Sequence, residues 1–411
     1  MLRMIPTTLQ NNSIEQRVKR LTFWYAFLMA FPAIVIYQNI SIFIFPLLFF
    51  SLYSLSGRFL NLKYFVQLIA IAFGAGAIIS VWNMPNSMPT GSFIRAMEVL
   101  PNYLYWVLLI LLFTSYKNLI KLDAIYDGIF FGTLFSLIYF FLLQNYLTTI
   151  LIFKLLTQNA FAFLLICYSP IVVWYTWHRY GFWWAGIVLL ILVLSGFLSG
   201  SRSGSLLTLS GGLLTFLLNR KSFGKISLIA LVGFIFLISI ANTEIIKSLV
   251  FGLNERTYDL IYNRKKTLEE DRSYLVRLAQ IEKANIIFNK YPLSGIGLNN
   301  FTNYRVKLPG NFEGAKYVVD KKQIDQKSAH NSYFGFLAEG GLLLLVPFIG
   351  LILYCIVWFL LNLNNLKPVY RPIFIGIIHM SIHLYFIYAI LNVFAWFLLG
   401  LGFLVIVKYK K

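Results

Sequence analysis

Long apolar runs separated by short polar segments make up most of the 411-residue chain. A bilayer core about 30 Å thick needs about 20 residues of helix, so runs of this kind predict transmembrane helices. Twelve runs qualify once the shorter ones are extended into their flanks: 21–37, 40–55, 66–82, 100–114, 125–142, 160–177, 182–198, 205–218, 226–241, 340–361, 373–387 and 391–407. The pattern therefore predicts an all-α polytopic membrane protein.

One polar segment, residues 242–331, interrupts this pattern. It holds 15 of the 35 Lys and Arg residues and 10 of the 15 Asp and Glu residues. Within it, apolar residues at 275, 278, 281, 284 and 288 recur near helical spacing and predict an amphipathic helix, with Arg277 beside the apolar stripe. We expect one integral membrane domain in three parts: helices in 1–241, a large loop with short helices at 242–331, and three helices in 332–411.

Composition and charge fix the class and the orientation. Apolar residues make up 59% of the chain and charged residues 12%, against about a quarter charged in soluble domains. With twelve spans, the segments on the side of the termini carry 17 Lys and Arg, and the short loops on the other side carry three. The positive-inside rule then predicts cytoplasmic termini and a periplasmic loop in a bacterial inner membrane. Residues 1–20 are polar and basic, and we expect no cleavable signal.

The sequence lacks the motifs of several common kinds of catalytic or cofactor site. There is no phosphate-binding Walker loop, no CxxC or HExxH motif, and no Asp-x-Asp pair in an outer loop. Gly295 and Gly297 follow Tyr291 and Pro292 in a polar loop, which indicates a turn and not a nucleotide site. Both cysteines fall inside predicted spans. We therefore expect neither a metal nor a nucleotide cofactor.

Two arginines are candidates for binding an anion. Arg202 lies among Ser and Gly residues in the short turn 198–205. Its planar guanidinium suits phosphate, and the amides opening the next helix add a positive field. Snorkelling to the headgroups is an equal alternative. For Arg277, spacing alone favours a surface position paired with Glu282 or Glu270.

His330 lies where the apolar sequence resumes after the polar segment. A histidine titrates near neutral pH and can accept a proton, but a lone histidine here also fits an interfacial anchor. Asn331 or Ser328 can cap the helix that follows. A second pair, His379 and His383, lies one helical turn apart within a span; it fits a proton path or, more simply, hydrogen bonding between helices.

The order of these motifs resembles the O-antigen ligase and polymerase superfamily, most firmly from about 190 to 345. The resemblance rests on Ser201-Arg202-Ser203-Gly204, then Arg277, Pro292-Leu293-Ser294-Gly295-Ile296-Gly297, His330-Asn331-Ser332-Tyr333 and Glu339-Gly340-Gly341. It implies transfer of a glycan from a polyprenyl (undecaprenyl) diphosphate carrier to an acceptor at the periplasmic face, without metal or nucleotide.

The same resemblance implies the roles of individual residues. Arg202 and Arg277 bind the diphosphate, and His330 is the general base of an inverting attack. Asn331 and Glu339 are supporting candidates, as is Arg305 in the basic part of the loop.

Three functions remain open. The leading hypothesis is an O-antigen ligase with a lipid A–core acceptor, because one long basic loop suits a phosphorylated acceptor. The first alternative is an O-antigen polymerase, whose acceptor is a second lipid-linked glycan; the second outer segment, 83–99, is short for that group. The other is a lipid-linked oligosaccharide flippase, which disagrees with the near absence of carboxylates from the spans. No nucleic-acid partner is expected.

Overall fold

The computed structural model describes residues 7–31, 40–57, 60–143, 157–219, 248, 262–263, 272–308, 329–388 and 392–409. Over these residues the chain forms helices and no strand, which confirms the all-α class for this part of the protein. The elements are α1 (Thr7–Ala30), α2 (Ile40–Ser56), α3 (Phe65–Trp82), α4 (Ser92–Ser115), α5 (Leu122–Ile138), the π-helical turn η1 (Tyr139–Leu143), α7 (Gln158–Tyr180), α8 (Phe182–Leu198), α9 (Arg202–Asn219), α14 (Arg272–Lys290), α17 (Ser332–Asn362), the 3₁₀ turn η2 (Pro368–Tyr370), α18 (Arg371–His383) and α19 (Val393–Tyr409).

Many of these helices have the character of membrane spans. Five are long and apolar enough to cross a bilayer: α3, α4, α5 with η1, α7 and α17. Shorter apolar helices lie at Phe45–Ser56, Phe182–Leu198, Ser203–Leu218 and Val393–Tyr409. Every apolar run in the sequence overlaps a described helix except 226–241, which lies outside the described residues. The count of twelve spans stays a prediction.

The helices pack side by side into a bundle with an aromatic interior. Helix α1 packs mainly against α5, and α3 packs mainly against α17. Helix α7 contacts α8, α9 and α18. Trp106 of α4 stacks on Trp396 of α19 with ring centroids 4.4 Å apart. Outward-facing side chains such as Leu190, Val346 and Leu360 are exposed, as expected for surfaces that face lipid.

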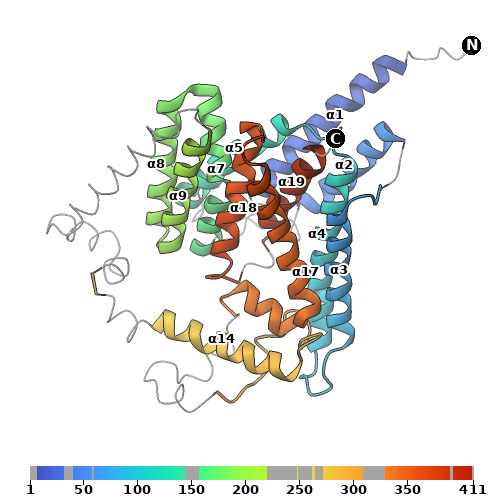
Figure 1. The fold of residues 1–411 in the computed structure, drawn as a ribbon, viewed down its shortest axis with the longest axis vertical. Coiled ribbons are helices and arrows are strands. Elements are labelled where there is room, and N and C mark those ends of the chain that lie inside the picture. Colours follow the sequence, from blue (N-terminus) through green and yellow to red (C-terminus); the bar gives the residue numbers. More distant parts are fainter. Residues whose placement is uncertain are drawn as a thin grey trace, which may run out of the picture.

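One helix does not follow the bundle direction. In Figure 1, α14 lies across the lower end of the bundle, while the start of α1 and the end of α19 lie at the upper end. Both ends of the described chain are thus on the same side, away from α14. The compartment that each end faces stays a prediction.

Candidate functional site

The candidate site lies at the α14 end of the bundle, where α9 and α17 begin and α18 ends. Ser201 Oγ accepts a hydrogen bond from the Gly204 N–H at 3.2 Å and so caps α9. Arg202 is therefore the first residue of this helix. The sequence pattern predicts a turn there and a helix from Ser205; the serine cap begins the helix three residues earlier.

Two contacts fix α9 and α18 as antiparallel neighbours. The Arg371 guanidinium donates to the Leu218 carbonyl oxygen at one end. Eight residues along each helix from that contact, His379 Nε2 hydrogen-bonds Ser210 Oγ at 2.9 Å. A further step of eight residues leads to Arg202 on α9 and to Ile387, just beyond α18. The backbone of Arg202 therefore lies at the level of the chain that leaves α18.

The start of α17 is tied to the same stretch of chain. The Ser332 N–H donates to the Leu384 carbonyl oxygen at 2.9 Å, and Ser332 Oγ donates to the Ile387 carbonyl oxygen at 2.7 Å. His330 precedes this anchor by two residues, is half-buried, and has a left-handed backbone with φ of 48°. That conformation is uncommon for a residue other than glycine. The conformation persists because the bonds of Ser332 to Leu384 and Ile387 hold the chain that follows His330 in place.

Asn331 caps α17. Its Oδ1 accepts hydrogen bonds from the N–H groups of Tyr333 at 3.0 Å and Phe334 at 3.2 Å, which confirms the predicted cap. Its side chain is buried, and Nδ2 has no hydrogen-bond partner among the described residues. Most buried polar atoms in folded proteins are paired, so an unpaired amide nitrogen is unusual. It can donate a hydrogen bond to a ligand that enters the site.

The predicted amphipathic helix is present as α14, but its buried face only partly follows the apolar stripe. The residues buried on α14 are Val276, Ala279, Gln280, Lys283, Ala284 and Ile287. Of the stripe, only Ala284 is fully buried, and the residues at 275, 278, 281 and 288 are half-buried. The reason is that Gln280 and Lys283 face inward although they are polar. Arg277 flanks this face, is half-buried, and lies within electrostatic range of the His383 ring. The structure thus brings Arg277 to the end of α18.

The segment that follows α14 interlocks with α17. The helix α17 breaks at Gly341, which has φ of 59°. A Cβ at Gly341 would lie 2.3 Å from the Leu293 carbonyl oxygen, so only glycine fits this close approach. The bonds that join the two segments run from Leu342 N to Pro292 O (2.9 Å), Leu343 N to Leu293 O (3.1 Å), Ile296 N to Ala338 O (3.0 Å) and Gly297 N to Glu339 O (2.9 Å). The predicted turn at 295–297 is confirmed, and its glycines serve this backbone contact.

The Glu339 carboxylate holds the loop that follows the interlock. Oε2 accepts the Asn299 N–H at 3.0 Å and the Tyr388 hydroxyl at 2.5 Å, and Oε1 accepts the Phe301 N–H at 3.1 Å. Its backbone oxygen accepts the Ser80 hydroxyl at 2.8 Å. The side chain is 2% exposed. Glu339 is therefore placed to position the loop, with its oxygens already engaged by protein donors.

Further contacts anchor the loop 298–308. Asn300 Nδ2 donates to the Ser92 carbonyl oxygen at 3.0 Å, and Arg95 Nη1 donates to Asn303 Oδ1 at 2.8 Å. The Lys283 ammonium lies 4.9 Å from the centre of the Phe301 ring. Arg305 is exposed on this loop, and its supporting role stays a prediction.

A tyrosine pair marks the outer edge of the loop. Hydrogen bonds with Tyr304 and Tyr291 raise the pKa of Lys290 at the end of α14. A hydrogen bond with Ser87, 3.3 Å from the Tyr291 hydroxyl, lowers the pKa of Tyr291, whereas burial raises the pKa of Tyr304. These contacts join α14 to the loop between α3 and α4.

Two residues that shape this site, Lys283 and Tyr388, are not predicted by the sequence pattern. Lys283 is buried on α14, but charged residues are rarely buried, so the sequence gives no sign of this position. Tyr388 reaches Glu339 only through the fold, since the two are 49 residues apart.

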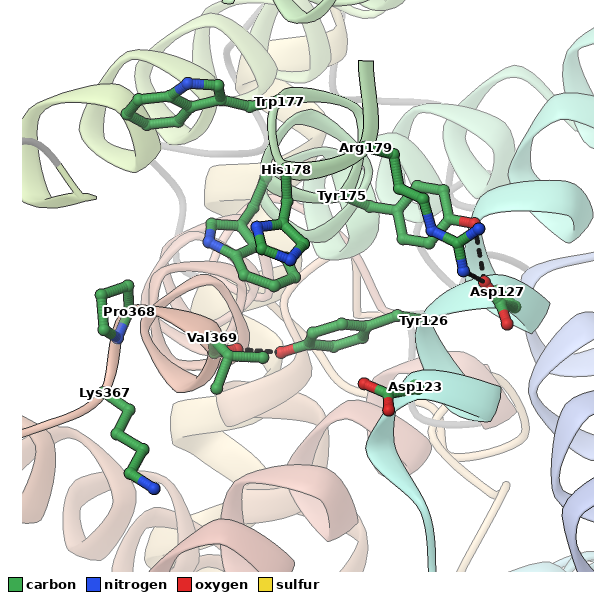
Figure 2. Close-up of a pocket in the computed structure, with 11 residues that line it drawn as sticks. Asp123, Tyr126, Asp127, Tyr175, Trp177, His178, Arg179, Lys367, Pro368 and Val369 are labelled. Atoms are coloured by element: carbon green, nitrogen blue, oxygen red, sulfur yellow. Dashed lines mark hydrogen bonds and ion pairs between the residues drawn. The ribbon is translucent and has the colours of Figure 1, made fainter. Parts of the chain in front are cut away.

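A separate cavity of about 760 Å³ lies at the opposite end of the bundle, between α5, α7 and the link from α17 to α18 (Figure 2). Its Asp127 carboxylate is already bound by the Tyr175 hydroxyl at 2.6 Å and by Arg179 at 3.3 Å. His178 stacks on Trp174 there, with ring centroids 5.1 Å apart. Arg277 and His330 are not among its lining residues, and α9 begins at the other end of the bundle, so the cavity is distinct from the candidate site.

Comparison with known proteins agrees with the resemblance seen in the motifs. Residues 187–349 match the family model described as O-antigen ligase. This segment includes α9, α14 and the first half of α17, and with them Arg202, Arg277, His330 and Glu339. No curated protein gives a significant match to the chain. The match over residues 187–349 supports membership of the chain in the O-antigen ligase superfamily.

Proposed function

We propose that this protein is an O-antigen ligase: it transfers a glycan from a polyprenyl diphosphate carrier to a lipid A–core acceptor. Its family is one of ligase-type and polymerase-type membrane glycosyltransferases. The observation that carries the proposal is the meeting of three elements at one end of the bundle. These are the start of α9 with Arg202, the α14 flank with Arg277, and the turn with His330 before α17.

In the proposed reaction, the acceptor hydroxyl attacks the anomeric carbon of the carrier-linked sugar. A new C–O bond forms as the bond between the sugar and the diphosphate breaks, and the bonding electrons leave with the polyprenyl diphosphate. His330 takes the proton of the attacking hydroxyl and later releases it to solvent. General-base catalysis of this kind contributes about 10²- to 10⁴-fold. Attack in a single step inverts the anomeric centre.

The leaving diphosphate gains negative charge as the glycosidic bond breaks. Arg202 and Arg277 are proposed to stabilise this charge, an effect worth about 3–4 kcal/mol for one well-placed donor. The first-turn amides of α9 add to the positive field at the same place. The proposed reaction runs without metal or nucleotide, so it should continue in the presence of EDTA.

The proposed orientation has α14 in the periplasm of a bacterium and the described chain ends toward the cytoplasm. It rests on the 17 Lys and Arg in the terminal and connecting segments on the side of the termini, against three in the short loops on the other side. A lipid-linked glycan and lipid A–core both reach this face of the inner membrane, whereas nucleotides do not.

Genetic complementation tests the proposal and separates it from the polymerase alternative. The gene should restore long glycan on lipid A–core in a host that lacks its own ligase. H330A should abolish this activity, and H178A, altered in the opposite cavity, should not. If the gene extends glycan chains only in a polymerase-deficient host, the protein is a polymerase and the ligase assignment is wrong.

A further inference from the structure

The two histidines of α18 differ in a way that points to a ligand. His379 is paired at both ring nitrogens: Nδ1 with the Ile375 carbonyl oxygen at 2.8 Å and Nε2 with Ser210 Oγ at 2.9 Å. His383, one turn later, is 1% exposed, and neither ring nitrogen has a hydrogen-bond partner among the described residues. Leaving buried polar atoms unpaired is costly, so such atoms in a folded protein need an explanation.

The surroundings of His383 indicate where an unseen partner would bind. One face of the ring packs on Phe163 of α7, with centroids 5.4 Å apart and an interplanar angle of 32°. Arg277 of α14 lies within electrostatic range of the ring. The residue that follows, Leu384, accepts the Ser332 N–H at 2.9 Å, which brings the start of α17 alongside. His383 is therefore enclosed by the same elements that carry Arg277 and His330.

The start of α9 lies against the same part of α7. A Cβ at Gly204 would lie 2.7 Å from the Ala162 side chain, and Ala162 precedes the Phe163 that supports His383. Arg202 is two residues from Gly204. The backbone at the start of α9, the Arg277 side chain and the His383 ring thus converge on one region, and Arg277 brings positive charge to it.

We propose that His383 is a third diphosphate-binding residue, donating a hydrogen bond to a phosphate oxygen of the polyprenyl diphosphate between Arg202 and Arg277. An imidazole ring carries at least one N–H donor in either protonation state. Phosphate oxygens are strong acceptors, and hydrogen bonds to charged groups are the strong ones. The aromatic support from Phe163 holds the ring in place without using its nitrogens. This inference rests on the proposed function, because it names a residue for the same carrier.

The substitution H383F tests the inference, with H379F as the matched control. Phenylalanine keeps an aromatic ring against Phe163 but removes both nitrogens, so H383F should leave the melting temperature of the ligand-free protein unchanged or higher. H379F breaks the hydrogen bonds with Ser210 and Ile375 and should lower it. In ligand binding the order should be reversed: H383F should lose affinity, and H379F should keep it.

Binding is measured on the purified full-length protein in lipid nanodiscs, with geranylgeranyl diphosphate as the probe and geranylgeranyl monophosphate for comparison. H383F should weaken diphosphate binding by about 10- to 100-fold, the usual range for one hydrogen bond to a charged group. H379F should bind within about twofold of wild type. H383Q, whose amide nitrogen replaces Nε2, should recover most of the affinity.

Unchanged diphosphate affinity in a folded H383F protein would overturn the inference while leaving the proposed function intact. The inference is also wrong if H383F and H379F lose affinity equally, because the effect would then be structural. If wild type binds the diphosphate no better than the monophosphate, both the inference and the proposed carrier fall.

Discussion

Replacing Glu339 by glutamine tests whether this carboxylate positions the loop or takes part in the chemistry. Glutamine has the same shape but exchanges one acceptor oxygen for an N–H₂ donor. If the amide nitrogen takes the place of Oε1, it faces the Phe301 N–H; if it takes the place of Oε2, it faces the Asn299 N–H. In either orientation one backbone N–H loses its acceptor, that of the buried Phe301 or that of the exposed Asn299.

The size of the effect follows from these contacts. An unpaired buried donor costs about 1–3 kcal/mol. The remaining hydrogen bonds lose their charge assistance, which costs about 1 kcal/mol more, and relief of the buried charge offsets part of the sum. We expect E339Q to lower the free energy of unfolding by about 2 kcal/mol. E339A, which leaves all three donors unpaired, should lower it further.

The assay is thermal unfolding of the purified protein in detergent, followed by glycan transfer at a temperature where each variant is folded. Melting temperatures should fall in the order wild type, E339Q, E339A. The exposed Glu98 on α4 provides the control, since E98Q makes the same chemical change without a buried contact. A variant E339Q with wild-type stability and no transfer activity would refute the positioning role and place Glu339 in the reaction.

Three further predictions concern the same end of the bundle. N331D keeps an acceptor for the Tyr333 and Phe334 N–H groups but removes the unpaired Nδ2. Its melting temperature should stay near that of wild type, while the transfer rate should fall at least tenfold. N331A should in addition lose about 1 kcal/mol of stability, because the helix cap is removed. G341A forces a side chain onto the Leu293 carbonyl oxygen at positive φ and should prevent stable folding, whereas G350A, whose nearest contact would be Ile69 at 3.6 Å, should be tolerated in the same thermal assay. R277K should reduce transfer by about 10-fold or more, because a single ammonium does not reproduce the bidentate fork; full activity in a transfer assay would remove Arg277 from the diphosphate site.

The helices and their order could be predicted from hydropathy because each apolar run is long and local. Eleven of the twelve runs overlap described helices on that basis. The break at Gly341 could not be predicted, since its cause is a backbone contact with Leu293, 48 residues earlier in the chain. The burial of polar residues on α14 could not be predicted for a related reason. Burial of Lys283 and Gln280 depends on what they meet across the site, and spacing along one helix does not contain that information.

For the candidate residues as well, local contacts could be predicted from the sequence, and contacts between distant segments could not. Asn331 could be named as one of two candidate caps, with Ser328, from its place before an apolar helix, since the cap contacts lie within three residues. The difference between His379 and His383 was not visible in the sequence, where the two lie one turn apart on the same helix. It arises because Ser210 of α9 reaches only the first of them.

Ligase activity with His330 as the base can be measured as glycan transfer by the purified protein in nanodiscs that contain EDTA, labelled polyprenyl diphosphate-linked glycan and lipid A–core. We predict that label moves to lipid A–core with release of one polyprenyl diphosphate per glycan, and that a folded H330A variant is slower by about 10²- to 10⁴-fold. Transfer by H330A at the wild-type rate would rule out His330 as the base, and no transfer to lipid A–core by the wild-type protein would rule out the ligase.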